Sequence, residues 1–291
     1  EEVKYKSFIT LQNHILDCNK NNKKFFIGRL SGNENLLIGK VLLKQPLPQY
    51  LMNNMLYAAG IKFNSMNDIF KYVDIYNKSI NKTTLLGVWD CYMYKQAEVH
   101  LNYLLKIYPH IKQFAAHSLE PYYYMNSNEY KFNELFKNKK ILIISSHKKT
   151  IENQIINMDK LYKKKIFDKT AIFKVYKPAQ QNAGSNDEHS WLFHLNVMKK
   201  EIKKIKNNDF NFDIALVSAG GFGMILCDFI YSELNSSVMY IGGPLQLFFG
   251  INGQRWVNNE RIKNTQNKYW TKVLQEDMPK NTSLCENSSY W

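Results

Sequence analysis

Continuous apolar runs alternate with amphipathic segments from residue 139 onward. The runs are rich in β-branched and aliphatic residues, which is typical of strands covered on both faces. They are KKILIISSH (139–147), TAIFKVYKP (170–178), FDIALVS (212–218) and SVMYIGG (237–243). The segments between them have apolar residues at helical spacing: KTIENQIINMDKLY (149–162), HSWLFHLNVMKKEIKKIK (189–206) and MILCDFIYSEL (224–234). Because crossover helices join consecutive parallel strands, this alternation predicts a parallel sheet with helices on both faces.

The first 135 residues contain more helix and fewer strands. Helices are predicted at SFITLQNHILDC (7–18), after the break QPLPQ (45–49), at MNDIFKYVDIYNKSI (66–80) and at AEVHLNYLLKIY (97–108). Strands are predicted at KKFFIGRL (23–30) and TTLLGVWD (83–90). We therefore expect one Rossmann-like α/β domain over residues 1–291 with a mostly parallel sheet. Its helix-rich half (1–135) precedes a half in which strands and helices alternate (136–291).

The composition fits a globular protein that can bury an ample core. The chain has 291 residues, 45% of them hydrophobic, and no apolar run long enough to predict a membrane span. No CxxC pair occurs among its four cysteines, Cys18, Cys91, Cys227 and Cys285. Widely spaced cysteines of this kind are typical of free thiols in a reducing compartment, so we expect a cytoplasmic location.

The net charge of +14 indicates a nucleic-acid binder, a membrane-surface protein or a protein with an anionic substrate. The lysines cluster beside or within predicted helices, at residues 20–24, 137–140, 162–165 and 199–206. Solvated helix faces account for such clusters, and the sequence has no arginine-rich arm, zinc finger or RRM-type aromatic strand. The lysine clusters are therefore interpreted as solvated helix faces and connections in preference to a nucleic-acid patch.

Four polar or glycine-rich stretches follow predicted strands. They are RLSGNE (29–34), SSHKKT (145–150), SAGGFG (218–223) and IGGPLQ (241–246). Ligands of open parallel sheets bind beyond the carboxyl ends of the strands, where loops and helix N-termini meet. We expect these stretches to meet at one binding site.

Gly220, Gly221 and Gly223 permit a tight turn before a helix whose amide groups can face an anion. Their spacing differs from the dinucleotide fingerprint GxGxxG. Ligand contact and pure turn geometry both remain open as explanations.

His147 ends a predicted strand, where its ring can contact a phosphate, transfer a proton or cap the next helix. Arg255 lies beside Trp256 and can clamp a diphosphate or simply pack on the ring. The other histidines have no HExxH or similar ligand spacing, which argues against a histidine-based metal site: His14, His100, His110, His117, His189 and His194.

Sugar or phosphoryl transfer needs a carboxylate, as the base for an acceptor hydroxyl or as a ligand for a divalent cation. Four acids lie outside clear helix faces: Glu34, Asp90, Glu120 and Asp187. The sequence does not rank them.

Several stretches together resemble one family. IGRLSGNE resembles the RFGDGE-type motif of GT-D fold glycosyltransferases. The succession KKILIISSHKKTIENQI, KVYKPAQ, FDIALVSAGGFG and YIGGPLQLFFGINGQRW, with a terminal YW, resembles a branch of that superfamily. The similarity covers most of the chain from about residue 25, and GGPLQLFFGINGQRW is its most specific part.

The resemblance implies a Rossmann-like transferase that uses a nucleotide diphosphate sugar and, in better-known members, a divalent cation such as manganese. The arginine and glutamate of the motif match Arg29 and Glu34, whereas Gly32 stands where the family has aspartate. This departure removes one expected metal-binding carboxylate. Asn33 can supply a neutral oxygen instead, or lysine and arginine can replace the charge of the Mn²⁺ or Mg²⁺ ion.

The resulting hypothesis is sugar transfer from a nucleotide sugar, a UDP-sugar in particular, to a hydroxyl of a glycan or glycoprotein. Its candidate catalytic residues are Glu34, Asp90, Glu120 and His147, and its candidate metal ligands are Glu34 and Asn33. Its candidate donor-binding residues are Arg29, Ser31, Gly32, Asn33, Ser145, Ser146, Lys177, Gly220, Gly221, Gly223, Gly242, Gly243, Gln246 and Arg255.

Two alternatives stay open. One is a nucleotide- or glycan-binding module of the same fold without catalysis, and the other is a basic nucleic-acid-binding protein. The aromatic segment YIGGPLQLFFGI fits a homodimer contact as well as a core. The high lysine and asparagine content suggests an AT-rich genome, such as that of a large DNA virus or a low-GC bacterium.

Overall fold

A computed structural model describes residues 2–89 and 95–291. Seven strands form one sheet in the order β3-β2-β1-β7-β6-β4-β5, and every neighbouring pair is parallel. The strands are β1 (Phe26–Arg29), β2 (Leu85–Val88), β3 (Gln113–Ala115), β4 (Lys140–Ser145), β5 (Ile172–Tyr176), β6 (Ile214–Ser218) and β7 (Ser237–Tyr240). The predicted α/β, Rossmann-like architecture with a parallel sheet is confirmed.

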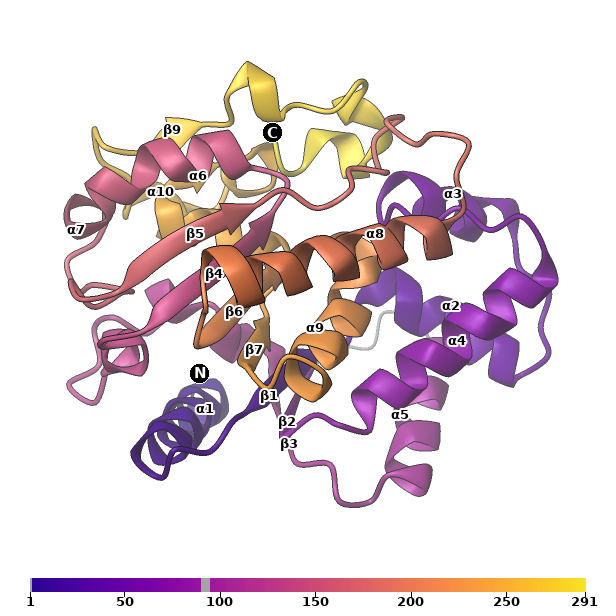
Figure 1. Cartoon of the computed structure of the whole chain (residues 1–291), viewed down its shortest axis with the longest axis horizontal. Coiled ribbons are helices and arrows are strands. Elements are labelled where there is room, and N and C mark those ends of the chain that lie inside the picture. The colour runs from indigo at the N-terminus through magenta and orange to yellow at the C-terminus, as the bar shows by residue number, and fades with distance from the viewer. Residues whose placement is uncertain (1, 90–94) are drawn as a thin grey trace.

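Helices cover both faces of this sheet (Figure 1). They are α1 (Glu2–Lys20), α2 (Gly32–Leu42), α3 (Gln49–Tyr57), α4 (Met66–Ile80), α5 (Lys95–Ile107), α6 (Lys148–Gln154), α7 (Met158–Leu161), α8 (Trp191–Lys204), α9 (Gly223–Ser232) and α10 (Glu260–Lys263). In Figure 1, α8 and α9 cross in front of the sheet, and α1 lies at the lower left. A second, two-stranded sheet pairs β8 (Ile251–Asn252) with β9 (Thr271–Lys272).

Each face of the sheet has its own apolar core, because strand side chains alternate between the faces. In β4, Leu142 and Ile144 pack into the core that includes α4, α5, α8 and α9, whereas Ile141 and Ile143 pack into the core that includes α1. All four are fully buried. The continuous apolar runs of the sequence therefore arise because both faces of each central strand are covered.

The two halves of the chain share this sheet. Strands β1 to β3 come from residues before 136 and β4 to β7 from residues after it, and β1 pairs with β7. The apolar segment after β7, with Leu245, Leu247, Phe248 and Phe249, is buried in the core on the α1 side. This placement makes that segment part of the core instead of a surface for dimerisation.

Three elements differ from the pattern-based expectations. Helix α2 begins at Gly32, where the sequence suggested a turn, because Ser31 adopts the extended N-cap conformation and the next apolar residues are buried. Strand β3 has only three residues, too few to leave a periodic pattern. The helix expected at 149–162 divides into α6 and α7 around a 3₁₀ turn, Ile155–Asn157. This turn directly follows the buried Gln154, whose side-chain amide donates hydrogen bonds to the carbonyl groups of Phe249 and Tyr269.

No helix in residues 2–89 and 95–291 is both long and apolar enough to cross a membrane. The described cysteines, Cys18, Cys227 and Cys285, are buried free thiols.

Candidate functional site

A cavity of about 680 Å³ lies at the carboxyl ends of the strands. Residues that follow β1, β2, β4, β5, β6 and β7 all contribute to its wall. Parallel strands end at the same edge of the sheet, so segments far apart in the sequence meet there. The volume is in the range of sites that enclose a small organic ligand or cofactor.

Most of the predicted site residues line this cavity. They are Arg29, Ser31, Gly32, Asn33, Glu34, Ser146, His147, Gly220, Gly242, Gly243, Gln246 and Arg255. All four strand-end stretches therefore contribute to the wall of one cavity.

Arg29, the last residue of β1, extends its guanidinium group between two aromatic rings. Its Cζ lies 5.5 Å from the centre of the Trp89 ring and 5.2 Å from that of Tyr240. Gly242 has a φ of +72°, and a Cβ atom built there would lie 2.2 Å from Arg29 Nη2. Glycine at position 242 thus provides both the left-handed backbone and the space that the guanidinium group occupies.

Glu34 lies in the first turn of α2 and is only 4% exposed. The pKa of its carboxyl group is raised from the ordinary 4.5 to about 7, mainly because the group is buried and to a smaller extent because Glu286 lies nearby. A backbone hydrogen bond and the positive charge of Arg29 act in the opposite direction. A carboxyl group with a pKa near neutrality can accept and release a proton at physiological pH.

A chain of hydrogen bonds connects the segments after β1 and β6 with the last residue of β7. Ser31 Oγ lies 3.1 Å from the hydroxyl oxygen of Tyr240, which in turn donates to the carbonyl oxygen of Gly220 at 2.9 Å. The Tyr240 ring also occupies the space beside Gly223, where an added Cβ would lie 2.2 Å from the ring. Tyr240 therefore fixes the relative positions of three strand ends.

His147 follows β4, and its ring is buried in the cavity wall. Burial lowers the pKa of the imidazole from 6.5 to about 4, despite the nearby Asp277 carboxylate. The neutral ring packs edge-on against Trp291, with ring centres 6.1 Å apart. At neutral pH His147 is thus an uncharged hydrogen-bonding group, and the positive charge beside the cavity comes from the arginines.

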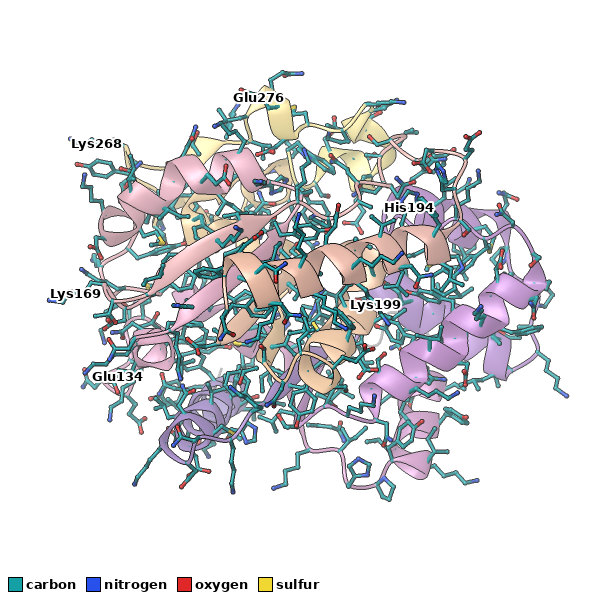
Figure 2. All side chains as sticks on the ribbon, viewed as in Figure 1. Glu134, Lys169, His194, Lys199, Lys268 and Glu276 are labelled. Atoms are coloured by element: carbon teal, nitrogen blue, oxygen red, sulfur yellow. The ribbon has the colours of Figure 1, made fainter. Side chains whose placement is uncertain are left out.

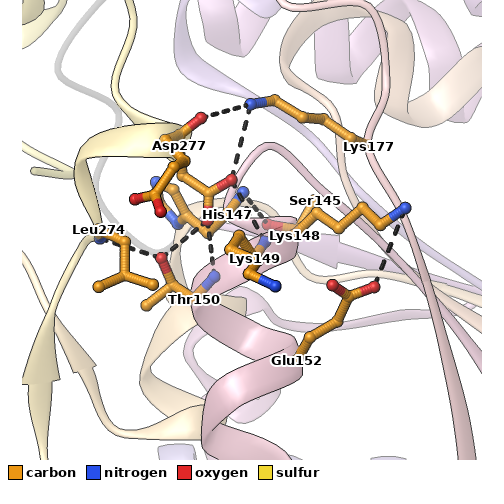
Figure 3. Close-up of polar contacts among 10 residues, drawn as sticks. Ser145, His147, Lys148, Lys149, Thr150, Glu152, Lys177, Leu274 and Asp277 are labelled. Atoms are coloured by element: carbon orange, nitrogen blue, oxygen red, sulfur yellow. Dashed lines mark hydrogen bonds and ion pairs between the residues drawn. The ribbon is translucent and has the colours of Figure 1, made fainter.

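Asp277 anchors the start of α6 from the opposite end of the sequence (Figure 3). Its buried carboxylate accepts hydrogen bonds from the backbone N–H groups of Lys149 and Thr150 and from Thr150 Oγ1, at 3.2, 2.7 and 2.7 Å. Lys177 Nζ lies 3.6 Å from the same carboxylate. This network holds the segment that carries His147, because residues 148–150 follow it directly.

The other predicted residues have different positions. Ser145 is buried and its hydroxyl accepts from His147 N–H, while Lys177 pairs with Asp277. Gly221 and Gly223 allow close packing with Ile61 and Tyr240. These four lie outside the cavity lining.

Glu120 is also absent from the lining, but it lies within electrostatic range of Arg29 and Arg255. It is buried, and it accepts a hydrogen bond from the hydroxyl group of Tyr122. Burial raises the pKa of its carboxyl group. Asp90 lies outside the described residues.

Pattern reasoning missed several residues of the wall. Trp89 directly follows β2, so the rule that ligands bind at carboxyl ends could have identified it. Tyr240 lies within β7 and has no distinguishing signal. Glu286, Tyr290 and Trp291 reach the cavity from the end of the sequence, and no local pattern could have placed them there, although the YW ending was noted as part of the resemblance.

The cavity wall contains an unusual share of polar atoms without hydrogen-bond partners. Among the described residues, seven buried side-chain polar atoms lack a partner, and five of them belong to residues that line the cavity. The five are Arg29 Nε, His147 Nε2, Gln180 Nε2, Gln246 Oε1 and Trp291 Nε1. Buried polar groups are nearly always paired, so this concentration is unusual, but the five atoms are enclosed within the wall and have almost no surface facing the cavity.

Glu34 and Asn33 were the expected metal ligands. Asn33 Oδ1 accepts a hydrogen bond from Asn54 at 3.3 Å, and Glu34 faces the positive charge of Arg29. In residues 2–89 and 95–291, Glu34 belongs to no group of three His, Cys, Asp or Glu side chains close enough to bind one ion. A cation at this position would therefore need oxygen ligands from the bound molecule itself.

Comparison of the chain with protein-family models, with curated proteins and with solved structures finds no match in any of the three.

Proposed function

We propose that the protein is a glycosyltransferase that moves a sugar from a nucleotide diphosphate sugar, in particular a UDP-sugar, to a hydroxyl group of a glycan or glycoprotein. The observation that carries this proposal is the cavity at the carboxyl edge of a parallel sheet, whose wall contains Arg29, Arg255 and the buried Glu34. The resemblance of IGRLSGNE to the GT-D motif supports the same activity.

The charges around the cavity suit a diphosphate. Arg29 and Arg255 both line the wall, and a leaving diphosphate gains negative charge as the bond to the sugar breaks. Fixed guanidinium groups stabilise that charge without having to move during the reaction. The rings of Trp89 and Tyr240 hold Arg29 in place and offer flat surfaces near which a base or a sugar can pack.

Glu34 is the proposed catalytic base. In the transfer, the acceptor oxygen forms a bond to the anomeric carbon, and the bond from that carbon to the diphosphate oxygen breaks with its electron pair remaining on the diphosphate. The acceptor hydroxyl loses its proton, which Glu34 takes up. A pKa of about 7 makes Glu34 a stronger base than an exposed carboxylate while leaving it largely ionised at slightly alkaline pH.

A divalent cation is a secondary part of the proposal. Glu34 Oε and Asn33 Oδ1 are the protein oxygens offered, and Mn²⁺ or Mg²⁺ would take its remaining ligands from the phosphates. Two arginines already face the cavity, so we expect donor binding to persist without metal.

Ligand-dependent melting tests the binding part of the proposal. The purified chain is heated with UDP, GDP, dTDP or CMP, each with and without Mn²⁺. A nucleotide present at a hundred times its dissociation constant should add about 2.7 kcal/mol of stability and visibly raise the melting temperature. If none of them raises it, the cavity is no nucleotide site and the proposal fails.

Release of sugar from a UDP-sugar tests the catalytic part. Without an acceptor we expect slow hydrolysis whose rate rises through pH of about 7 as Glu34 ionises. Glu34→Gln should reduce the rate by at least about a hundredfold. Glu233→Gln, an exposed glutamate after α9, is the matched control and should leave it unchanged.

The same two measurements separate the rival functions. A catalytically inactive binding module would show the nucleotide-dependent rise in melting temperature but release no sugar. A nucleic-acid binder would show neither and would bind DNA or RNA with an affinity that falls steeply as salt increases.

A further inference from the structure

A second cluster of side chains lies outside the residues that line the cavity. Asp187 and His189 belong to the loop between β5 and α8, and His194 lies in the first turn of α8. One ligand atom from each side chain lies within 4.8 Å of the other two. Figure 2 shows His194 near the N-terminal end of α8, the end at which this loop arrives.

The separations within the cluster match those of metal ligands. Asp187 Oδ1 lies 2.9 Å from His194 Nε2 and 3.4 Å from His189 Nδ1. With metal–ligand bonds of about 2.1 Å, neighbouring ligand atoms lie about 3.4 Å apart in a tetrahedral site and about 3.0 Å apart in an octahedral one. An ion can therefore bind among the three side chains with only small rotations.

The loop and helix hold these side chains in place. The His189 ring stacks on Phe193, with ring centres 4.2 Å apart, and the His194 side chain is only 9% exposed. Ser190 caps α8 by accepting a hydrogen bond from Phe193 N–H. These contacts restrict both rings before any ion binds.

The Asp187 carboxylate is the shared partner of the two histidine residues, because its Oδ1 accepts a hydrogen bond from His189 N–H at 2.9 Å and lies 2.9 Å from His194 Nε2. Lys62 Nζ donates to the backbone carbonyl oxygen of Asp187 at 3.4 Å, and the carboxylate itself faces the two histidines. Two imidazole nitrogens and one carboxylate oxygen form a ligand set that suits Zn²⁺ and neighbouring transition metals and leaves a coordination position for water.

We propose that Asp187, His189 and His194 bind one divalent transition-metal ion of the zinc class, and that this ion fastens the loop 178–190 to α8. The loop also forms part of the wall of the main cavity, through residues 178–182. Gln181 connects the two places, because its side-chain oxygen accepts a hydrogen bond from Asp187 N–H at 3.1 Å. Metal binding would thus stiffen one wall of the cavity, whatever ligand that cavity takes.

Titration of the chain with metal tests the site directly. Protein without a histidine tag is stripped with a chelator and titrated with Zn²⁺ by calorimetry and with Co²⁺ by visible absorption. We expect one ion per chain and, for Co²⁺, ligand-field bands of a site with nitrogen and oxygen ligands. His189→Gln and Asp187→Asn change exposed side chains, so both variants should fold, and each should weaken binding by at least about tenfold.

His110→Gln is the matched control, since His110 is exposed and lies outside the cluster. It should bind the ion as the unchanged protein does. Absence of one-to-one binding overturns the proposal, as does binding that His189→Gln and Asp187→Asn leave intact or that His110→Gln weakens equally.

Amide hydrogen exchange tests the fastening of the loop. Zn²⁺ should slow exchange at residues 178–190 in the unchanged protein but not in His189→Gln. If the ion binds with the expected stoichiometry and exchange stays the same, the structural effect on the loop is refuted while the site itself stands.

Discussion

At the scale of single residues, glycines leave the space that larger neighbouring side chains occupy. Arg29 occupies a position that any side chain at residue 242 would fill, and Tyr240 does the same beside Gly223. By contrast, a Cβ added at Gly32 would meet no atom within 4 Å. A side chain at Gly242 or Gly223 should therefore disturb the structure more than one at Gly32.

This difference gives the first prediction. Gly242→Ala should destabilise the protein by about 2 kcal/mol or more, because alanine disfavours the left-handed backbone and its methyl group displaces the Arg29 guanidinium. It should also abolish any nucleotide-dependent rise in melting temperature. Gly32→Ala is the control, and in the first turn of α2 it should be neutral or stabilising by up to about 1 kcal/mol. Equal effects of the two changes would refute this view of position 242.

The raised pKa of Glu34 makes stability depend on pH. The folded protein holds a proton on Glu34 up to pH of about 7, whereas the unfolded chain releases it above 4.5. The contribution is therefore complete below 4.5 and is lost as pH rises to about 7, which amounts to about 3 kcal/mol. Urea unfolding at several pH values should show this decline relative to Glu34→Gln.

His147 should have the opposite effect. Its folded pKa of about 4 lies below the unfolded 6.5, so its contribution is complete above 6.5 and is lost as pH falls to about 4. His147→Gln should remove that loss on the acid side. If both variants follow the pH dependence of the unchanged protein, neither group is buried in the protonation state inferred here.

The sequence identified most of the chemically important residues but not their protonation states in the folded protein. Arg29, Glu34 and His147 stood out because they follow predicted strands. The raised pKa of Glu34 and the neutral state of His147 arise from burial by distant segments, which no local pattern contains. Likewise, the absence of HExxH spacing could not reveal that the loop brings Asp187 beside His189 and His194.

At the scale of elements, a side chain from a distant part of the sequence can cap a helix whose own N-cap residue does not. Helix α6 begins at Lys148 without a side-chain cap from its own N-cap residue, His147. Asp277, in the 3₁₀ turn Gln275–Asp277, supplies the acceptors instead. The start of α6 therefore depends on a residue more than a hundred positions away.

Asp277→Ala should therefore destabilise the protein by about 3 kcal/mol, since it leaves two N–H groups and the Thr150 hydroxyl without their acceptor and removes the carboxylate that pairs with Lys177. Glu276→Ala changes the exposed side chain next to it and should cost less than about 0.5 kcal/mol. Urea unfolding monitored by circular dichroism measures both values. A small effect at Asp277 would mean that water replaces the cap.

Long elements with a regular apolar period could be predicted from the sequence, whereas short elements and a helix that begins with glycine and polar residues could not. Helix α4 has the predicted bounds, residues 66–80, because its apolar positions recur at helical spacing and Ser65 caps it. Helix α2 was missed because Gly32 and Asn33 in its first turn are typical of turns. Its identity depends on the burial of Leu36, Leu37 and Ile38, which only the packed fold provides.

At the scale of the whole molecule, one sheet joins the two halves of the chain. The alternation of strands and helices predicted that the sheet is parallel, but the pairing of β1 with β7 requires contacts between residues more than two hundred positions apart. That pairing places RLSGNE next to IGGPLQ and so forms the cavity from both halves.

Amide exchange across the sheet should reflect this order. Strands β2, β1, β7, β6 and β4 have neighbours on both sides, so their amide groups should exchange slowest and at similar rates. The edge strands β3 and β5 should exchange faster. Rates that separate β1 and β2 from β4 and β6 would instead mean that the halves open independently.

Trp89 and Trp291 both line the cavity, whereas Trp191 and Trp256 are buried in the cores and Trp270 packs against the core on the α1 side. Two of the chain's indole groups would therefore touch whatever occupies the site, while the others would not. The fluorescence of the unmodified protein should then quench or shift in colour as the cavity fills. The intrinsic tryptophan fluorescence of the protein can therefore follow ligand binding in real time without an attached label.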